Sequence, residues 1–235
     1  MASAFINGQI INYEIKGNRD FRLRTPALLL HGNGEDMSTF FKLVSLLPQR
    51  GFVLMDSRYQ GGSIPEDGAD EPKITYDLMA DDALKLMEDE LGISEYDIIG
   101  FSDGAITALK MALSSIHVRK LILIGVNSDP SGLKPKMQRL IKKDHAEALR
   151  QKNRVEAELC RMMLEEPRLT SQTLANIICE TTVIYGKNDE AINRKHSQAI
   201  ADAIPRGSFT VINGAAHDVL ATHSNEVAEL VRALL

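Results

Sequence analysis

The chain of 235 residues has no tryptophan, only two cysteines and no long apolar run. Cys160 and Cys179 form no CxxC pair and lie in no cluster with metal-ligand spacing, so we expect buried or idle thiols, no metal and no cofactor. No stretch approaches the roughly 20 apolar residues that cross a bilayer, and residues 1–10 lack the basic start and apolar run of a targeting segment. These absences predict a soluble, cytoplasmic protein that does not enter a membrane.

A strong excess of one charge is missing as well. The net charge is −5, and no Arg/Lys-rich segment is interleaved with aromatic residues, so nucleic acid is not an expected partner. Apolar residues make up 44% of the chain and charged residues 25%, which is an ordinary globular mixture. This length and composition predict one α/β domain with a sizeable core.

The most informative motif is Gly-Phe-Ser-Asp-Gly at residues 100–104. It follows the β-like run 96–99 and precedes the helix-like run 105–113. A strand that turns sharply into a helix lifts the residue at its apex away from the backbone, so we predict that Ser102 is a nucleophile. The alternative is a glycine-flanked helix cap, in which Ser102 or Asp103 only caps the helix.

Two residues follow later strands at positions that suit partners of this serine. Asp189 lies in the loop after the strand-like run 181–185, and His217 follows the run 208–212. Open α/β sheets place their sites at the carboxyl ends of strands, so we predict His217 as the base and Asp189 as the acid that orients it. Asp129 remains an alternative acid, because it follows another strand-like run, 119–124.

A glycine-rich loop lies upstream, after the strand-like run 27–30. It reads His31-Gly32-Asn33-Gly34. The backbone N–H groups of Asn33 and Asp103 are the predicted oxyanion donors, while His31 is expected to hold the loop through a hydrogen bond. The Asp103 side chain has two interpretations: it caps the helix or meets solvent, or it holds a substrate ammonium.

Strand-like and helix-like segments alternate along most of the chain. Residues 4–6 and 9–15 flank an Asn-Gly turn and indicate an antiparallel hairpin. The later alternation is typical of βαβ crossovers. We therefore predict an α/β fold with a mostly parallel central sheet of about eight strands flanked by helices. Only the interval 127–173 breaks the alternation, because it carries helical periodicity alone.

Together these features resemble the α/β-hydrolase fold family over nearly the whole chain, and the small lid-bearing serine hydrolases most of all. The matching segments are the loop 31–34, residues 56–63, the turn 100–104, and Asp189 and His217 in the order nucleophile, acid, base. Tyr59-Gln60 departs from the pattern, since many members have a glycine there. The resemblance implies a core of residues 1–126 and 177–235 and an inserted helical lid, residues 127–176.

The lid segment suggests how a substrate is recognised. Three methionines on its helices are expected to wall the pocket, with ordinary packing as the alternative: Met137, Met162 and Met163. The segment carries ten Lys or Arg against seven Asp or Glu. Such a basic lid suits an anionic substrate, unless the charges only solvate the outer helix faces. The basic residues of first interest are Lys142, Lys143 and Arg150.

The function that these predictions support is acyl transfer to Ser102. The expected partner is a small acyl substrate, a carboxylic ester, thioester or related compound, hydrolysed through an acyl-enzyme. Serine at the turn disfavours the dehalogenase and epoxide-hydrolase branches of the fold, which need a carboxylate nucleophile. Two alternatives stay open: hydrolysis of activated C–C bonds with the same triad, and a non-catalytic ligand-binding member of the fold.

Overall fold

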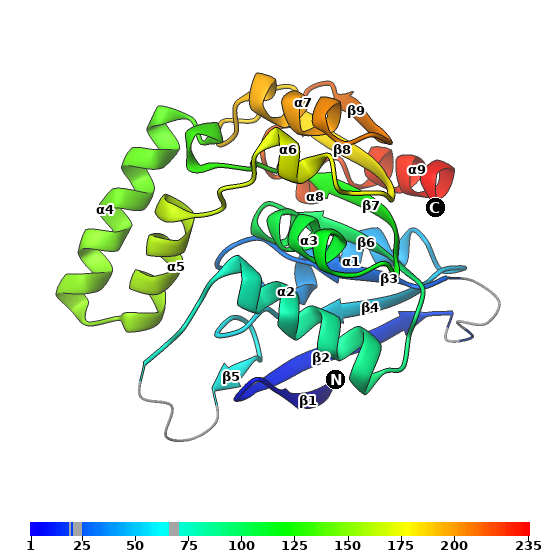
Figure 1. Ribbon diagram of the computed structural model, residues 1–235, viewed down its shortest axis with the longest axis horizontal. Helices are drawn as coiled ribbons and strands as arrows, with labels where there is room; N and C mark the ends of the chain where they lie inside the picture. The colour runs from blue at the N-terminus through cyan, green and yellow to red at the C-terminus, as the bar shows by residue number, and fades with distance from the viewer. Residues whose placement is uncertain (19, 21–24, 66–70) are drawn as a thin grey trace.

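A computed structural model of the chain describes residues 1–18, 20, 25–65 and 71–235. These residues form a nine-stranded sheet, in which eight strands follow the order β1-β2-β4-β3-β6-β7-β8-β9 and β5 pairs with β2 (Figure 1). The strands are β1 Ala2–Ile6, β2 Gln9–Gly17, β3 Ala27–Leu30, β4 Gly51–Met55, β5 Ile64–Pro65, β6 Tyr96–Phe101, β7 Val118–Ile124, β8 Glu180–Gly186 and β9 Gly207–Ile212.

The sheet is parallel from β4 to β9 and antiparallel at its N-terminal edge. Every neighbouring pair from β4 through β3 and β6 to β9 is parallel. The pairs β1–β2, β2–β4 and β2–β5 are antiparallel. The prediction of a mostly parallel sheet with an N-terminal hairpin is confirmed. The sequence did not reveal β5, which has only two residues and no pattern of its own.

Helices cover both faces of this sheet, as expected for an α/β fold. The helices of the described residues are η1 Met37–Phe40, α1 Phe41–Ser45, α2 Tyr76–Leu84, η2 Lys85–Glu90, α3 Asp103–Ser114, η3 Pro130–Gly132, α4 Pro135–Gln151, α5 Arg154–Glu165, α6 Ser171–Leu174, α7 Arg194–Ala203, α8 Val219–Thr222 and α9 Ser224–Leu234. Side chains of α2, α3 and α7 bury one face, and those of α1, α8 and α9 bury the other.

Strand β3 shows how the two faces share one apolar run. Successive side chains of a strand point to opposite faces. Leu28 and Leu30 accordingly join the core beneath α2, α3 and α7, while Ala27 and Leu29 join the core beneath α1, α8 and α9. A strand buried on both faces needs apolar residues at every position, which is why this segment does not alternate with polar residues.

The chain reverses its direction of travel across the sheet between β3 and β6. From β3 it passes to β4 on one side, and from β6 it continues through β7 and β8 to β9 on the other. In open α/β sheets ligands bind in the crevice outside the strand ends at such a point. The loops after β3 and β6 contain the two predicted oxyanion donors, so the topology brings these loops together.

Residues 127–176 form most of their structure outside the two helical layers. Helices α4 and α5 pack against each other and stand side by side at the left of Figure 1. A separate apolar cluster, which includes Ile141, Cys160 and Ile192, joins them to the loop after β8. The segment is also tied to the main core, because Met162 of α5 and Leu174 of α6 are buried there.

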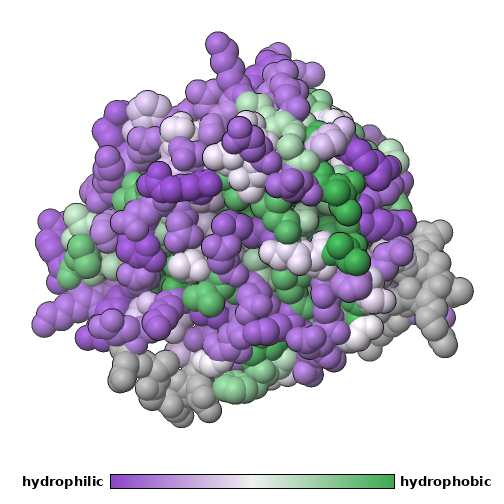
Figure 2. Space-filling model, viewed as in Figure 1, coloured by the Kyte–Doolittle hydropathy of each residue, from purple (hydrophilic) through white to green (hydrophobic). Residues whose placement is uncertain are grey.

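The outer surface is dominated by hydrophilic residues, with small apolar areas between them on the face shown in Figure 2. Within the described residues no helix is long and apolar enough to cross a membrane.

Candidate active site

Ser102 lies at the turn between β6 and α3, with φ 51° and ψ −116°. A positive φ is costly for a residue with a side chain, and such strain is common at functional turns. The Ser102 N–H donates to the carbonyl of Ile124 at 2.8 Å and holds the turn. A Cβ on Gly100 would lie 2.4 Å from the carbonyl oxygen of Gly104, and a Cβ on Gly104 would lie 2.0 Å from that of Leu30. The glycines therefore permit the tight strand-to-helix turn.

The Ser102 hydroxyl meets two residues from distant parts of the chain. Its Oγ lies 3.2 Å from Nε2 of His217, in the loop after β9, and Nδ1 of His217 lies 2.8 Å from Oδ2 of Asp189, in the loop after β8. Asp189 is fully buried. Its Oδ1 accepts the N–H groups of Ala191 and Ile192 at 2.8 Å each. The carboxylate is thus fixed by the backbone and points one oxygen at the imidazole.

Asp129, the alternative acid, contacts the start of η3. Its carboxylate accepts the N–H of Ser131 at 2.8 Å and caps η3. No hydrogen bond joins Asp129 to His217 in the part of the chain that the structure describes. The geometry therefore favours Asp189 as the carboxylate partner of His217.

The surroundings of His217 act on its basicity in opposite directions. Burial alone lowers the pKa of the imidazole, but the hydrogen bond to Asp189 and the negative charges of Asp189, Glu190 and Glu35 raise it, and the net pKa of His217 lies above its ordinary value. Glu190 is also held close, since its Oε2 accepts the backbone N–H of His217 at 3.1 Å. A proton that arrives at Nε2 is therefore stabilised by three nearby carboxylates.

The loop after β3 presents the backbone N–H of Asn33 without an acceptor among the described residues. The N–H of Gly32 donates to Glu35 Oε2 at 3.1 Å, and the N–H of Gly34 donates to Gln60 Oε1 at 2.7 Å. Between them, the N–H of Asn33 has no acceptor among the described residues, and the same holds for the N–H of Asp103 at the start of α3. Two free donors at neighbouring strand ends can receive a developing oxyanion.

His31 holds this loop, as its position predicted. Nδ1 lies 2.7 Å from the carbonyl oxygen of Gly32, and Nε2 lies 3.0 Å from the backbone nitrogen of Ser57. This pairing requires the proton on Nδ1, so that Nε2 accepts the N–H of Ser57. Met37 N–H also donates to Asp56 Oδ1 at 2.7 Å. The loop after β3 is thus fastened to the segment that follows β4.

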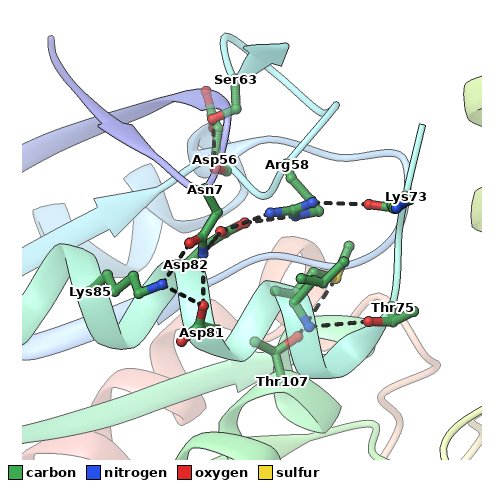
Figure 3. A network of polar contacts seen from close by, with 12 residues as sticks. Asn7, Asp56, Arg58, Ser63, Lys73, Thr75, Asp81, Asp82, Lys85 and Thr107 are labelled. Carbon is green, nitrogen blue, oxygen red and sulfur yellow. Dashed lines mark hydrogen bonds and ion pairs between the residues drawn. The ribbon is translucent and has the colours of Figure 1, made fainter. Parts of the chain in front are cut away.

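The segment that follows β4, residues 56–63, is anchored to α2 by a buried ion pair. Nε and Nη2 of Arg58 donate to the two carboxylate oxygens of Asp82 at 2.7 and 2.8 Å, and Nη1 donates to the carbonyl of Lys73 at 2.9 Å (Figure 3). Ser63 Oγ donates to the carbonyl of Asp56 at 2.7 Å and closes the segment on itself. Helix α2 therefore supports the loop after β3 through residues 56–63.

A cavity of about 330 Å³ opens at Ser102 and His217. Its apolar wall comes largely from α4, α5 and their flanks and includes Leu133, Met137, Leu140, Ile141, Cys160 and Met163. Predicted residues Met137 and Met163 therefore lie at the cavity. Met162 does not line it, because that side chain is fully buried in the core shared with α2 and α3. The expectation for Met162 is corrected to core packing.

The polar part of this cavity wall is acidic. The carboxylates are those of Glu35, Asp103, Asp144, Glu156, Glu190 and Asp218, and no Lys or Arg lies among the described lining residues. Three basic residues of α4 are exposed and do not contribute to the wall: Lys142, Lys143 and Arg150. The structure thus gives no support to a lid that attracts an anion into the pocket. In the described residues, no group of three or more His, Cys, Asp or Glu is placed to hold a metal ion.

Comparison with known proteins identifies the family. A family model described as alpha/beta hydrolase fold matches residues 25–173, which include the Ser102 turn and the loop after β3. The chain belongs to the alpha/beta hydrolase fold family. It is a hydrolase-type enzyme. No curated protein matches this hydrolase at the sequence level.

Several solved structures share the fold of this hydrolase over almost its full length. An esterase from Thermogutta terrifontis is 20% identical, with a TM-score of 0.75 and coverage of 96% of this chain and 92% of that one. An enol-lactonase from Burkholderia xenovorans LB400 is 18% identical, with a TM-score of 0.79 and 99% coverage of both chains. A meta-cleavage product hydrolase from Pseudomonas fluorescens IP01 is 18% identical, with a TM-score of 0.77 and coverage of 100% and 97%. At these identities the likeness concerns the fold.

Tyr76 is among the cavity residues of this hydrolase that sequence patterns do not reveal. Tyr76, the first residue of α2, lines the cavity, and its hydroxyl donates to Asp103 Oδ1 at 2.8 Å. The preceding Thr75 accepts the N–H of Leu78 and marks the helix start, which is a readable cap signal. Nothing local, however, indicates that the tyrosine meets a residue 27 positions later.

Proposed function

We propose that this protein is a serine hydrolase that acts on a carboxylic ester, thioester or related small acyl substrate through an acyl-enzyme. The observation that carries the proposal is the contact series from Ser102 Oγ to His217 Nε2 at 3.2 Å and from His217 Nδ1 to Asp189 at 2.8 Å. The Ser102 end of this series opens into the cavity, and the two free backbone N–H groups lie nearby. Nucleophile, base, orienting acid and anion donors are the parts that acyl transfer requires.

In the first step the Ser102 oxygen attacks the substrate carbonyl carbon while its proton passes to Nε2 of His217. The carbonyl oxygen becomes an oxyanion and accepts hydrogen bonds from the N–H groups of Asn33 and Asp103. One such donor is typically worth roughly 3–4 kcal/mol of transition-state stabilisation. Asp189 holds the Nδ1–H tautomer and stabilises the imidazolium, which then gives its proton to the leaving group as the carbonyl–leaving-group bond breaks.

Water completes the cycle by the reverse roles. His217 removes a proton from a water molecule, the resulting hydroxide attacks the acyl carbon, and the Ser102 oxygen leaves with the proton that His217 returns. The carboxylates of Asp189 and Glu190 favour the protonated imidazole in both transition states. The acid product and the free serine remain.

In this proposal residues 127–176 serve as the lid. Helices α4 and α5 supply the apolar wall that includes Met137 and Met163 and shield the acyl group from water. A cavity of about 330 Å³ lies at the small end of the range for ligand pockets, which favours short and medium acyl groups over long lipid chains.

The deciding experiment combines fluorophosphonate labelling with a substrate panel. We expect the probe to modify Ser102, and Ser102→Ala to lose both labelling and hydrolysis while its circular dichroism spectrum stays unchanged. Ser45→Ala is the matched control, since Ser45 lies on the surface and its hydroxyl donates to the carbonyl of Lys42. Labelling at another residue, or full activity of Ser102→Ala, contradicts the proposal.

The substrate panel separates the proposed activity from its alternatives. It contains p-nitrophenyl esters, acyl thioesters and a vinylogous diketone whose C–C bond is activated. Ester or thioester turnover supports the proposal. Turnover of the diketone alone assigns C–C hydrolysis instead, and no turnover of any member contradicts the proposed activity.

A further inference from the structure

The two residues that offer free backbone N–H groups are also joined through their side chains. Nδ2 of Asn33 donates to Oδ2 of Asp103 at 3.0 Å. The second oxygen of Asp103 accepts the hydroxyl of Tyr76 at 2.8 Å. The Asp103 carboxylate is thus held between a residue of the loop after β3 and a residue of α2. The residue is only 6% exposed.

The hydrogen bond between Asn33 and Asp103 joins the loop after β3 to the turn after β6, and the other side-chain hydrogen bonds of the loop do not. Glu35 and Gln60 hold the N–H groups on either side of Asn33, but they bind the loop to itself and to residues 56–63. Within the described residues, no other side-chain hydrogen bond joins the loop 31–36 to the turn 100–104. Beyond the pairing of β3 with β6, the two residues that carry the free N–H groups are therefore joined by one side-chain hydrogen bond.

We propose that Asp103 is a positioning residue, which together with Asn33 and Tyr76 sets the spacing of the two oxyanion donors. The inference rests on the proposed function, because an oxyanion exists only if Ser102 attacks a carbonyl. Oxyanion donors act at 2.7–3.1 Å from the oxygen, and a misplacement of about 1 Å can cost about 10²-fold in rate. A contact that fixes this spacing affects kcat more than substrate binding.

The hydrogen bonds of Asp103, and not its charge, perform this role. A negative charge next to a developing oxyanion opposes the reaction, whereas the two oxygens supply acceptors at fixed positions. Burial raises the pKa of Asp103, although the hydrogen bonds from Asn33 and Tyr76 act against this rise. An asparagine at position 103 has the same shape, and its amide can accept from Asn33 and donate to the hydroxyl oxygen of Tyr76.

The test compares variants that keep or remove these bonds. Asp103→Leu and Asn33→Ala should each lower kcat about 10- to 100-fold with little change in KM, and the double variant should be little worse than either, because the residues act as one unit. Tyr76→Phe should lower kcat less, since one bond to Asp103 remains. The rate of Ser102 labelling by fluorophosphonate should fall in parallel. Asp103→Asn should keep kcat within about threefold of the wild type.

Matched controls separate positioning from loss of stability. Asn176→Ala removes a surface amide that donates to the carbonyl of Gln172 at 3.3 Å. Tyr96→Phe removes a buried hydroxyl that donates to Glu88 at 2.8 Å, as Tyr76 does to Asp103, but at the opposite end of β6. Both controls should keep kcat. The melting temperature of each variant is measured, and if Asp103→Leu does not fold, Asn33→Ala and Tyr76→Phe carry the test.

Two results would overturn the positioning role of Asp103. The first is full kcat in Asn33→Ala. The second is an Asp103→Asn variant as impaired as Asp103→Leu, and a rise in KM confined to ammonium-bearing esters would then assign the charge of Asp103 to substrate binding. If the wild type is labelled at Ser102 and these variants are unimpaired, only this inference fails. If the wild type is not labelled and hydrolyses no substrate, the proposed function fails as well.

Discussion

Asp189 contacts His217 with one carboxylate oxygen and the protein backbone with the other. Oδ2 lies 2.8 Å from Nδ1 of His217, and Oδ1 accepts two backbone N–H groups, those of Ala191 and Ile192. This arrangement fixes the direction from which the imidazole is held. Because the carboxylate cannot rotate without losing bonds, His217 keeps one tautomer and one orientation.

Asp189→Asn should therefore lower kcat by about 10⁴-fold, because an amide can favour the wrong imidazole tautomer. Asp129→Asn is the matched control and should change kcat by less than about threefold, since its carboxylate caps η3. Steady-state kinetics on a p-nitrophenyl ester measure both effects. The opposite ranking would transfer the acid role to Asp129.

The pH dependence of kcat/KM should reflect the raised pKa of His217. If His217 is the base, as proposed, it must be neutral to act, so activity rises with pH through this pKa and the midpoint of the acid limb should lie above the ordinary histidine value of 6.5. Glu190→Gln removes a negative charge that stabilises the imidazolium, so its midpoint should move to lower pH. The exposed Glu229, replaced by Gln, serves as the control and should leave the profile unchanged. A shift of Glu190→Gln to higher pH would contradict the electrostatic account.

Two adjacent methionines should respond differently to truncation. Met163→Ala enlarges the cavity and should move the preferred acyl chain of a p-nitrophenyl ester series to greater length. Met162→Ala should leave that preference unchanged but lower the free energy of unfolding by about 2–5 kcal/mol, because it opens a hole in the core. Denaturant unfolding and kcat/KM against chain length separate the two roles. Equal shifts in chain preference would place both side chains at the cavity.

The acidic cavity wall should select against anionic acyl groups. An ester with a terminal carboxylate on its acyl chain should have a lower kcat/KM than a neutral ester of equal length, and added salt should narrow the difference. Glu156→Gln or Asp144→Asn should also reduce the difference in kcat/KM between the two esters. Lys142→Gln, on the exposed face of α4, is the control and should have little effect. A preference for the anionic ester would restore the alternative of a lid that attracts anions.

Removing one partner of the buried ion pair between Arg58 and Asp82 should destabilise the protein more than replacing both partners by apolar residues. Asp82→Ala leaves the guanidinium buried without its carboxylate and should lower the free energy of unfolding by about 3–5 kcal/mol. The double variant Arg58→Met with Asp82→Leu should lose less, because it buries no unpaired charge. Urea unfolding monitored by circular dichroism measures both. A double variant less stable than Asp82→Ala would show that the pair itself is strongly stabilising.

The sequence by itself determined the features that depend on neighbouring residues. The apolar runs define the parallel strands, the two glycines around Ser102 permit the sharp turn after β6, and the order of Ser102, Asp189 and His217 places each residue after a strand. Such features are readable because a strand, a turn or a cap is fixed by residues within a few positions of one another.

The tertiary structure alone decided which side chains meet. Met162 and Met163 are neighbours in the sequence, but successive residues of a helix point about 100° apart, so one enters the core and the other the cavity. The segment 127–176 is basic overall, yet the cavity wall to which it contributes is acidic, because none of its Lys and Arg residues lines the cavity. The contact between Asn33 and Asp103 depends on the register of β3 beside β6, which local sequence does not specify.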